Sequence, residues 1–376
     1  MAISALLLAA GPASADTLST PSLSGPLTAN PNPMGFDAGP LGRIYVGGIA
    51  SGFGALTSDP ESAAGDRHWR WDASNGEIFI QKTGGLLQFY VQAGAYNLPS
   101  LGTPLFATGK ETGDLYSPVP VAYAKFAPTS SFSILAGKLP ALIGAESTFT
   151  FQNMNIERGL LWNQEPAISR GVQANYASGP ISLSLSWNDG FYSNDFSWLS
   201  GLATWTIDSS NSISLVGSGN LDNTTKLSFA TPLYQNNSEI LNLVYTYSES
   251  PWTVTPYLQY TNVPPVAPPG PAQSGRTYGA AVLATYNLSV AWNLSGRIEY
   301  IEATGSAAAA APNLLYGPGS KAWSFTITPT WQSGIFFVRP EASLIALSNA
   351  TEGAALGSDF NARTQFRALV EAGVLF

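Results

Sequence analysis

The chain contains no cysteine among its 376 residues. Disulfide bonds, thiolate metal sites and cysteine nucleophiles are therefore excluded. The chain also holds a single histidine, His68, which stands between Arg67 and Trp69 in a polar stretch. Because a hydrolase needs an activated nucleophile with its base, and a metal site needs several ligands, the sequence indicates no catalytic residue, no metal and no cofactor.

Charge is scarce as well. Only 11% of the residues are charged, compared with about 25% in typical soluble proteins. The formal net charge of -8 argues against nucleic acid as a partner, which would require a basic face. Beyond the N-terminus there is no apolar run of about 20 residues, so a helical membrane protein is excluded. Aromatic residues make up 12%, which a disordered chain would lack.

The N-terminus resembles a secretory signal. A short apolar stretch, Ile3 to Ala10, precedes Ala13-Ser14-Ala15, which has the A-x-A pattern of a cleavage site. No Lys or Arg precedes the stretch, which leaves open a start codon placed too late or an ordinary apolar N-terminus. We predict a signal peptide over residues 1–15, an irregular segment rich in Pro, Ser and Gly over 16–40, and one β-barrel domain over 41–376.

What the chain has in abundance is alternation, most clearly in its last twelve residues. One face of this segment would carry Phe366, Ala368, Val370, Ala372, Val374 and Phe376. The other face would carry Gln365, Arg367, Glu371 and Gly373, since successive side chains of a strand point to opposite sides. An unbroken apolar face opposite a face with Arg and Glu is typical of a wall between lipid and water.

Sixteen segments alternate in this way. Strands are predicted at about 42–53, 74–82, 86–96, 118–127, 131–139, 169–178, 180–188, 198–207, 210–219, 238–248, 251–262, 276–287, 290–302, 321–332, 335–347 and 365–376. Short connections such as Thr83-Gly84-Gly85 alternate with long ones such as 97–117 and 140–168. This is typical of bacterial outer-membrane barrels, whose short turns are periplasmic and whose long loops are extracellular.

The fold predicted is therefore an all-β, single transmembrane, antiparallel up-and-down barrel of about 16 strands. Lys226 to Ala230 resembles a strand but is assigned to a long loop, and 14 or 18 strands remain as alternatives. A soluble sandwich would also alternate, yet the Trp, Tyr and Phe of sixteen strands would not fit inside one small core. Aromatic residues near strand ends are expected to form interfacial girdles: Tyr96, Trp187, Trp198, Trp205, Tyr260, Tyr286, Trp323 and Trp331.

Five short stretches carry a resemblance: Ile134 to Pro140, Ile143 to Glu146, Gly171 to Tyr176, Leu183 to Gly190, and Phe337-Val338-Arg339-Pro340-Glu341. With them the chain resembles the putative β-barrel porin type 2 family of Gram-negative outer-membrane proteins, over roughly residues 40–376. The resemblance implies an outer-membrane pore of unassigned selectivity, and it brings no catalytic residues.

A barrel of about sixteen strands leaves an aqueous channel, so its inner face is the candidate functional surface. Pore-lining charges are predicted on the last strands: Arg297, Glu299, Arg339, Glu341, Arg367 and Glu371. Arg339 is expected near Glu371, and Glu341 near Arg367, because their strands are antiparallel neighbours. Two roles remain open for these residues: a field that biases ion passage, or paired charges that hold the wall in register.

The long connection 140–168 is the candidate constriction. Its charged residues are Glu146, Glu157, Arg158 and Glu165, and it includes Phe149, Phe151 and Trp162. A connection of this length favours a role such as folding into the lumen, although a cap on the outside is an equal alternative.

The sequence thus predicts a porin of the bacterial outer membrane that passes small hydrophilic solutes or ions by passive diffusion. Its expected partners are outer-membrane lipid, lipopolysaccharide and the solutes themselves, and a homotrimer is left open. The main alternative is a surface adhesin or scaffold barrel whose lumen is plugged by loops. An outer-membrane enzyme is a third alternative.

Overall fold

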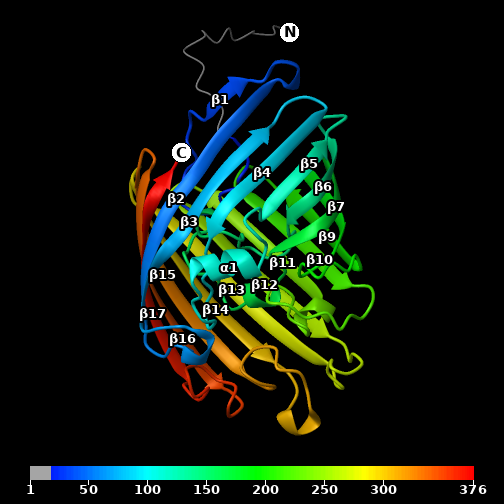
Figure 1. Cartoon of the computed structure of the whole chain (residues 1–376), viewed down its shortest axis with the longest axis vertical. Helices are drawn as coiled ribbons and strands as arrows, with labels where there is room; N and C mark the ends of the chain where they lie inside the picture. Colours follow the sequence, from blue (N-terminus) through cyan, green and yellow to red (C-terminus); the bar gives the residue numbers. More distant parts are fainter. Residues whose placement is uncertain (1–17) are drawn as a thin grey trace.

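The computed structural model describes residues 18–376, so the expected signal peptide over residues 1–15 lies outside the described residues. The described chain forms one barrel of tilted antiparallel strands, with β1 and the C-terminus at the same rim (Figure 1). We call this rim, at the top of Figure 1, the turn rim, and the opposite one the loop rim.

Sixteen strands make the wall: β2 (Arg43–Thr57), β3 (Trp69–Lys82), β4 (Leu87–Tyr96), β5 (Val121–Phe126), β6 (Phe132–Pro140), β7 (Ile168–Ser178), β8 (Ile181–Asn188), β9 (Trp198–Thr206), β10 (Asn211–Asn220), β11 (Glu239–Glu249), β12 (Trp252–Val263), β13 (Gly275–Asn287), β14 (Trp292–Ala303), β15 (Lys321–Ser333), β16 (Phe336–Asn349) and β17 (Thr364–Leu375). The remaining elements are short: β1 (Met34–Asp37), α1 (Thr108–Asp114), and the 3-10 turns η1 (Gly39–Leu41), η2 (Ser62–Ala64), η3 (Thr150–Gln152), η4 (Trp162–Gln164), η5 (Gln235–Asn237) and η6 (Ala307–Ala309).

The barrel closes without a free edge in its wall. Each wall strand pairs antiparallel with the next, and β17 pairs with β2, for example Leu375 with Ile49. The prediction of sixteen antiparallel strands is therefore confirmed, and Lys226 to Ala230 lies in a connection. Within the stretch expected to be irregular, β1 adds a short pairing to the beginning of β2, with Phe36 opposite Ile44.

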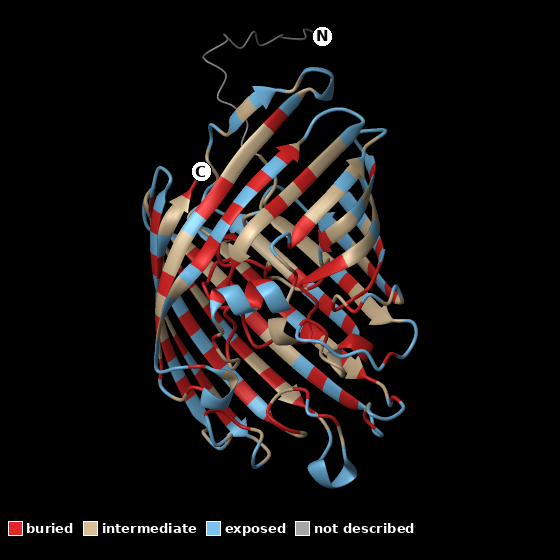
Figure 2. Cartoon of the chain, in the orientation of Figure 1, coloured by how far each residue is buried: buried red, intermediate tan, exposed pale blue. Residues whose placement is uncertain are grey.

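The two faces of the wall differ as the alternation predicts. On β17, the outward Phe366 and Val370 are 43% and 47% exposed, whereas the inward Arg367 and Glu371 are 1% and 0% exposed. Bands of exposed and buried residues follow one another along many of the strands in Figure 2. Because the outward face is apolar and the backbone is paired around the whole ring, the barrel meets the requirement of a lipid environment.

The connections alternate in length as expected. Turns such as 83–86 and 179–180 are short, whereas connections such as 97–120, 141–167 and 304–320 are long. Over residues 18–376 no helix is both long enough and apolar enough to cross a membrane. The buried apolar residues do not form a layer between two sheets, and most of them lie inside the barrel.

Candidate functional site: the lumen and its inserted loop

The connection between β6 and β7, residues 141–167, folds into the lumen, and we call it the inserted loop. Residues 148–161 are buried without exception. The loop lies against inward side chains of β3, β14, β15, β16 and β17, as its hydrogen bonds to these strands demonstrate. It therefore covers one side of the inner wall.

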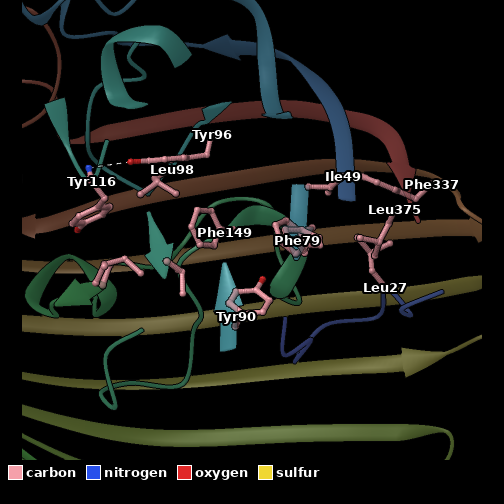
Figure 3. Packing of buried hydrophobic residues seen from close by; sticks show 14 of the residues in the cluster. Leu27, Ile49, Phe79, Tyr90, Tyr96, Leu98, Tyr116, Phe149, Phe337 and Leu375 are labelled. Carbon is pink, nitrogen blue, oxygen red and sulfur yellow. Dashed lines mark hydrogen bonds between the residues drawn. The ribbon is translucent and has the colours of Figure 1, made fainter. Parts of the chain in front are cut away.

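Aromatic contacts seat the loop against β3 and β4. The ring of Phe149 meets that of Tyr96 edge-on, with 5.5 Å between centroids, and the ring of Phe151 lies 5.6 Å from that of Phe79. Figure 3 shows Phe149, Phe79 and Tyr90 gathered within the barrel. Each such pair adds about 0.5–1.5 kcal/mol to the stabilisation from burial alone.

Arg339, on β16, binds the backbone of the inserted loop. Its guanidinium donates to the carbonyl oxygens of Thr150 at 3.0 Å, Asn153 at 3.0 Å and Met154 at 3.1 Å. Its Nη1 also lies 3.6 Å from a carboxylate oxygen of Glu371 on β17, as the strand pairing predicts. Glu371 in turn accepts a hydrogen bond of 2.8 Å from the hydroxyl of Thr150.

Two carboxylates of the wall accept hydrogen bonds from backbone N–H groups of the loop. Glu341 accepts from the amides of Ile156 at 2.5 Å and Glu157 at 2.9 Å. Glu299, on β14, accepts from the amides of Leu160 at 3.0 Å and Leu161 at 3.2 Å. The irregular backbone of the loop is thus satisfied inside the barrel by charged acceptors, which form the stronger class of hydrogen bond.

Two arginines of the wall reach the carboxylates of the loop. Arg297 donates to Glu146 at 2.6 Å and to the carbonyl of Glu157 at 2.7 Å. Arg367 is bonded to the carboxylate of Glu157. The expected pairing of Arg367 with Glu341 is not formed, because Ser343 is the residue opposite Arg367 and the guanidinium turns to the loop instead.

Two further charged residues of the loop are buried without hydrogen bonds. The guanidinium of Arg158 and both carboxylate oxygens of Glu165 have no such partner among residues 18–376, although Arg158 lies 5.2 Å from the ring centre of Trp162. Burial lowers the pKa of Arg158 to about 10 and raises the pKa of Glu165 well above its usual range. Burial also raises the pKa of Glu146, against the opposing effect of Arg297.

All ten charged residues predicted for the lumen or the constriction therefore lie inside the barrel, but they line a sealed contact between loop and wall. No group of three or more His, Asp or Glu side chains within residues 18–376 could hold a metal ion. His68 is exposed, and its Nδ1 lies 2.9 Å from the carbonyl oxygen of Thr57.

Two of the aromatic residues expected in the interfacial girdles lie inside instead. Tyr96 and Trp198 are both fully buried. The Tyr96 ring packs on the inserted loop, and the Trp198 indole donates to the carbonyl of Asn236 at 3.0 Å. Their assignment was wrong because both stand at the loop-rim end of a strand, where loops fold over the inward face.

Two other segments contact the inserted loop, and their positions were missed from the sequence. The connection 97–120, with α1, contacts the inserted loop through the amide of Leu101, which donates to the carbonyl of Arg158 at 2.9 Å. Residues 18–33, the N-terminal segment, lie between the inserted loop and the turn rim, and Leu27 is 2% exposed there. Neither segment carries a periodic signal that would have revealed this position.

The opposite side of the lumen is open. At the turn rim a cavity of about 870 Å³ lies between the N-terminal segment and the turns that follow β11, β13 and β15. We call it the vestibule. Several inward side chains here, such as Ser184, Ser214 and Thr246, are half-buried, so water reaches them, whereas others, such as Asn242 and Gln259, are buried.

Comparison with known proteins agrees with this geometry. The model of the family described as "Putative beta-barrel porin-2, OmpL-like" matches residues 44–376. No curated protein sequence matches the chain.

Solved structures share the fold at low sequence identity. OmpF of Salmonella typhi, in a complex with daunomycin, has a TM-score of 0.62 at 12% identity, covering 91% of this chain and 100% of its own. An anion-selective porin from Comamonas acidovorans has a TM-score of 0.59 at 10% identity, covering 89% and 99%. OmpT of Vibrio cholerae in its trimer form has a TM-score of 0.58 at 10% identity, covering 89% and 99%.

Proposed function

This chain is an outer-membrane porin of the putative beta-barrel porin-2, OmpL-like family, and from that premise we propose that it passes small hydrophilic solutes by passive diffusion beside the inserted loop. One observation carries the proposal: the loop binds the wall formed by β14 to β17 and reaches Gln259 of β12, while inward side chains such as Ser184, Ser214 and Thr246 on β8, β10 and β11 are only half-buried. Solutes would therefore cross along the uncovered wall.

In this proposal the charged residues have a structural role and do not contact the solute. Arg297, Glu299, Arg339, Glu341, Arg367 and Glu371 hold the inserted loop against the wall and so set the width of the pore. Glu146, Glu157, Arg158 and Glu165 belong to the constriction as parts of the loop itself. Glu146 and Glu157 are paired with Arg297 and Arg367, and all four side chains are buried away from the passing solute.

Conductance in planar bilayers tests the proposal. The purified chain should give discrete current steps, and deletion of Ser147 to Arg158 should enlarge them, roughly twofold or more, because the loop occupies cross-section that water would then fill. Unchanged steps in the deletion variant, shown to be folded by its heat-modifiable migration on gels, would contradict a constricting role for the loop.

A plugged scaffold or adhesin is the second candidate, and a specific observation favours it. Residues 148–161 are all buried and the N-terminal segment lies against them on the turn-rim side, so much of the lumen is filled. A folded barrel that gives neither current steps nor liposome swelling would identify a plugged barrel and contradict the porin mechanism proposed above.

The partners follow from the outer surface. Exposed apolar and aromatic side chains, such as Trp205 and Phe325, would contact the lipid of the outer membrane, and the loop rim would meet lipopolysaccharide. A homotrimer is proposed by analogy with OmpT, which has a trimer form. We assign no reaction to the chain, and turnover of lipid or peptide by the purified protein would contradict that assignment.

A further inference from the structure

The inner wall carries no charge over eight consecutive strands of the described barrel, and the inserted loop covers only part of these strands, at Gln259 of β12 and Gly279 of β13. From β6 to β13 every inward side chain is neutral, and the nearest inward charges are Lys125 on β5 and Arg297 on β14. Hydroxyl and amide groups take their place, most densely on β8 to β12, and those that are not buried are Ser182, Ser184, Thr204, Thr206, Ser212, Ser214, Ser218, Asn220, Thr246, Ser248 and Thr253. We call this surface the hydroxyl wall.

Neighbouring strands pair these groups with one another. Thr204 and Ser214 lie 2.8 Å apart, as do Ser200 and Ser218, and Ser184 donates to Asn175 at 2.8 Å. A hydroxyl offers one donor and two acceptor positions, so each pair retains unused hydrogen-bonding capacity. Because Thr204, Ser214 and Ser218 are only half-buried, that capacity faces the lumen.

The vestibule continues the same chemistry at the turn rim. Of the described residues that line it, none is Asp, Glu, Lys, Arg or His, and its polar groups come from residues such as Thr253, Thr285, Asn287 and Asn293. Its volume of about 870 Å³ lies within the roughly 300–1,000 Å³ of sites that hold small molecules. A solute that follows the hydroxyl wall would enter this space next.

The charged residues of the last strands, in contrast, are buried and do not face the proposed solute path along the hydroxyl wall. Arg339 and Glu371 are both 0% exposed, and Arg297 is 3% exposed. Each is engaged with the inserted loop or with an opposite charge. An ion that crosses along the opposite wall therefore meets few fixed charges to replace its hydration, whereas a neutral solute with hydroxyl groups can exchange hydrogen bonds with the wall.

We propose that this porin favours neutral, polyhydroxylated solutes of the sugar class over ions of similar size, with the hydroxyl wall and the vestibule as its recognition surface. The inference rests on the proposed porin function and names its solute class.

Liposome swelling with size-matched solutes tests the inference on the full chain. Glucose should enter at least about threefold faster than gluconate or protonated glucosamine, a modest change in barrier height. Charge placed on the hydroxyl wall should then redirect the preference: Ser214→Lys should favour gluconate over glucosamine, and Ser214→Asp should favour glucosamine. Ser214→Ala is the control, because it removes the hydroxyl group without adding a charge.

The possible outcomes distinguish a failure of the porin function from a failure of the preference for neutral solutes. Entry of glucose, gluconate and glucosamine at equal rates, or faster entry of either ion, would overturn the neutral preference while leaving the pore intact. Unchanged ratios in both charged variants, with heat-modifiable migration showing a folded barrel, would overturn the assignment of the hydroxyl wall as the path. No swelling with any solute would overturn the proposed function and the inference together.

Discussion

At the scale of single residues, Arg339 bears the largest share of the contact between wall and loop. It satisfies three loop carbonyls and lies beside Glu371, all in the interior. Removing one partner of a buried ion pair costs about 3–5 kcal/mol, because the remaining charge is left uncompensated. Arg339→Gln is therefore expected to lower the temperature at which the barrel unfolds on heat-modifiability gels and to make the single-channel current noisier.

Arg363→Gln provides the matched control, because Arg363 is an exposed arginine in the connection before β17. Its change should leave both the unfolding temperature and the current noise as in the parent chain. Equal behaviour of the two variants would contradict the anchoring role of Arg339.

Glu111 gives a pH-dependent prediction. It lies on α1, where its carboxylate accepts from the amide of Leu98 at 2.7 Å, and the charged residues around it are Arg158, Arg70 and Asp72. Burial raises the pKa of Glu111 to about 7 from the ordinary 4.5. The folded chain therefore binds this proton more tightly than the unfolded chain does, so stability should rise as the pH falls from about 7 to 4.5.

Glu111→Gln keeps an acceptor for Leu98 but removes the ionisation. The variant should unfold at a higher temperature than the parent at pH 8, by an amount equivalent to at most about 3 kcal/mol, and at the same temperature near pH 4.5. Asp114→Asn, on the exposed face of the same helix, should change neither value. A parent chain whose unfolding temperature is the same at pH 5 and pH 8 would contradict the buried ionisation.

The sequence predicted which of these charges face inward but not what they bind. Inward orientation follows from local alternation, so Arg339, Arg367 and Glu371 could be placed from the strand pattern alone. Their partners come from elsewhere in the chain: Arg339 binds Thr150 across 189 positions. A contact between residues so far apart in the sequence cannot be predicted from local alternation. For the same reason Tyr96 and Trp198 were assigned to the wrong face.

At the scale of elements, the N-terminal segment is the feature most open to experiment. The side chain of Gln81 donates to the carbonyl of Thr20 at 2.6 Å, and the amide of Thr28 donates to Gln332 at 2.8 Å. The amides of Ser24 and Gly25 both donate to the carbonyl of Gln152 in η3, at 2.8 and 3.2 Å. The segment therefore connects the turn rim to the inserted loop, and deletion of residues 18–33 should increase single-channel conductance.

Gly25 allows a finer test of the same element. A Cβ atom there would lie 2.1 Å from the carbonyl oxygen of Asn153, so Gly25→Ala must displace the segment from the loop. Gly84, in the turn between β3 and β4, has no atom within 4 Å of the corresponding position, so Gly84→Ala is the matched control. Conductance should rise in Gly25→Ala alone. If conductance increased in neither variant, the proposed contact between the N-terminal segment and the inserted loop would be contradicted.

The strands and the lumen segments differ in how far the sequence determines them. All sixteen wall strands follow from period-two alternation, because each strand of a barrel has lipid on one face and the interior on the other. The strand ends were the weaker part: β2 continues to Thr57 and β3 begins at Trp69, beyond the ranges predicted. The course of residues 18–33 and 97–120 depends on distant contacts, so the sequence predicted an irregular segment over 16–40 and a long connection over 97–117 without the position of either.

At the scale of the whole molecule, the wall is uneven in height. β5 has 6 residues, whereas β2 has 15 and β16 has 14. A membrane-crossing strand needs about 9–11 residues, so the wall at β5 is too short to face lipid over its full height. α1 lies below the ends of β4 and β5, and its residues Lys110 and Asp114 are exposed (Figure 2). A second copy of the chain would cover this polar region, as a trimer requires.

Cross-linking tests this arrangement directly, because the natural chain has no cysteine to interfere. Lys110→Cys is expected to give covalent multimers with a short bis-maleimide in outer-membrane vesicles, since α1 would lie at the contact between copies. Glu352→Cys, in an exposed part of the connection between β16 and β17, is the control and should remain monomeric. The proposed trimer would place the short wall at the centre of the assembly, so cross-linking at Glu352 but not at Lys110 would contradict it.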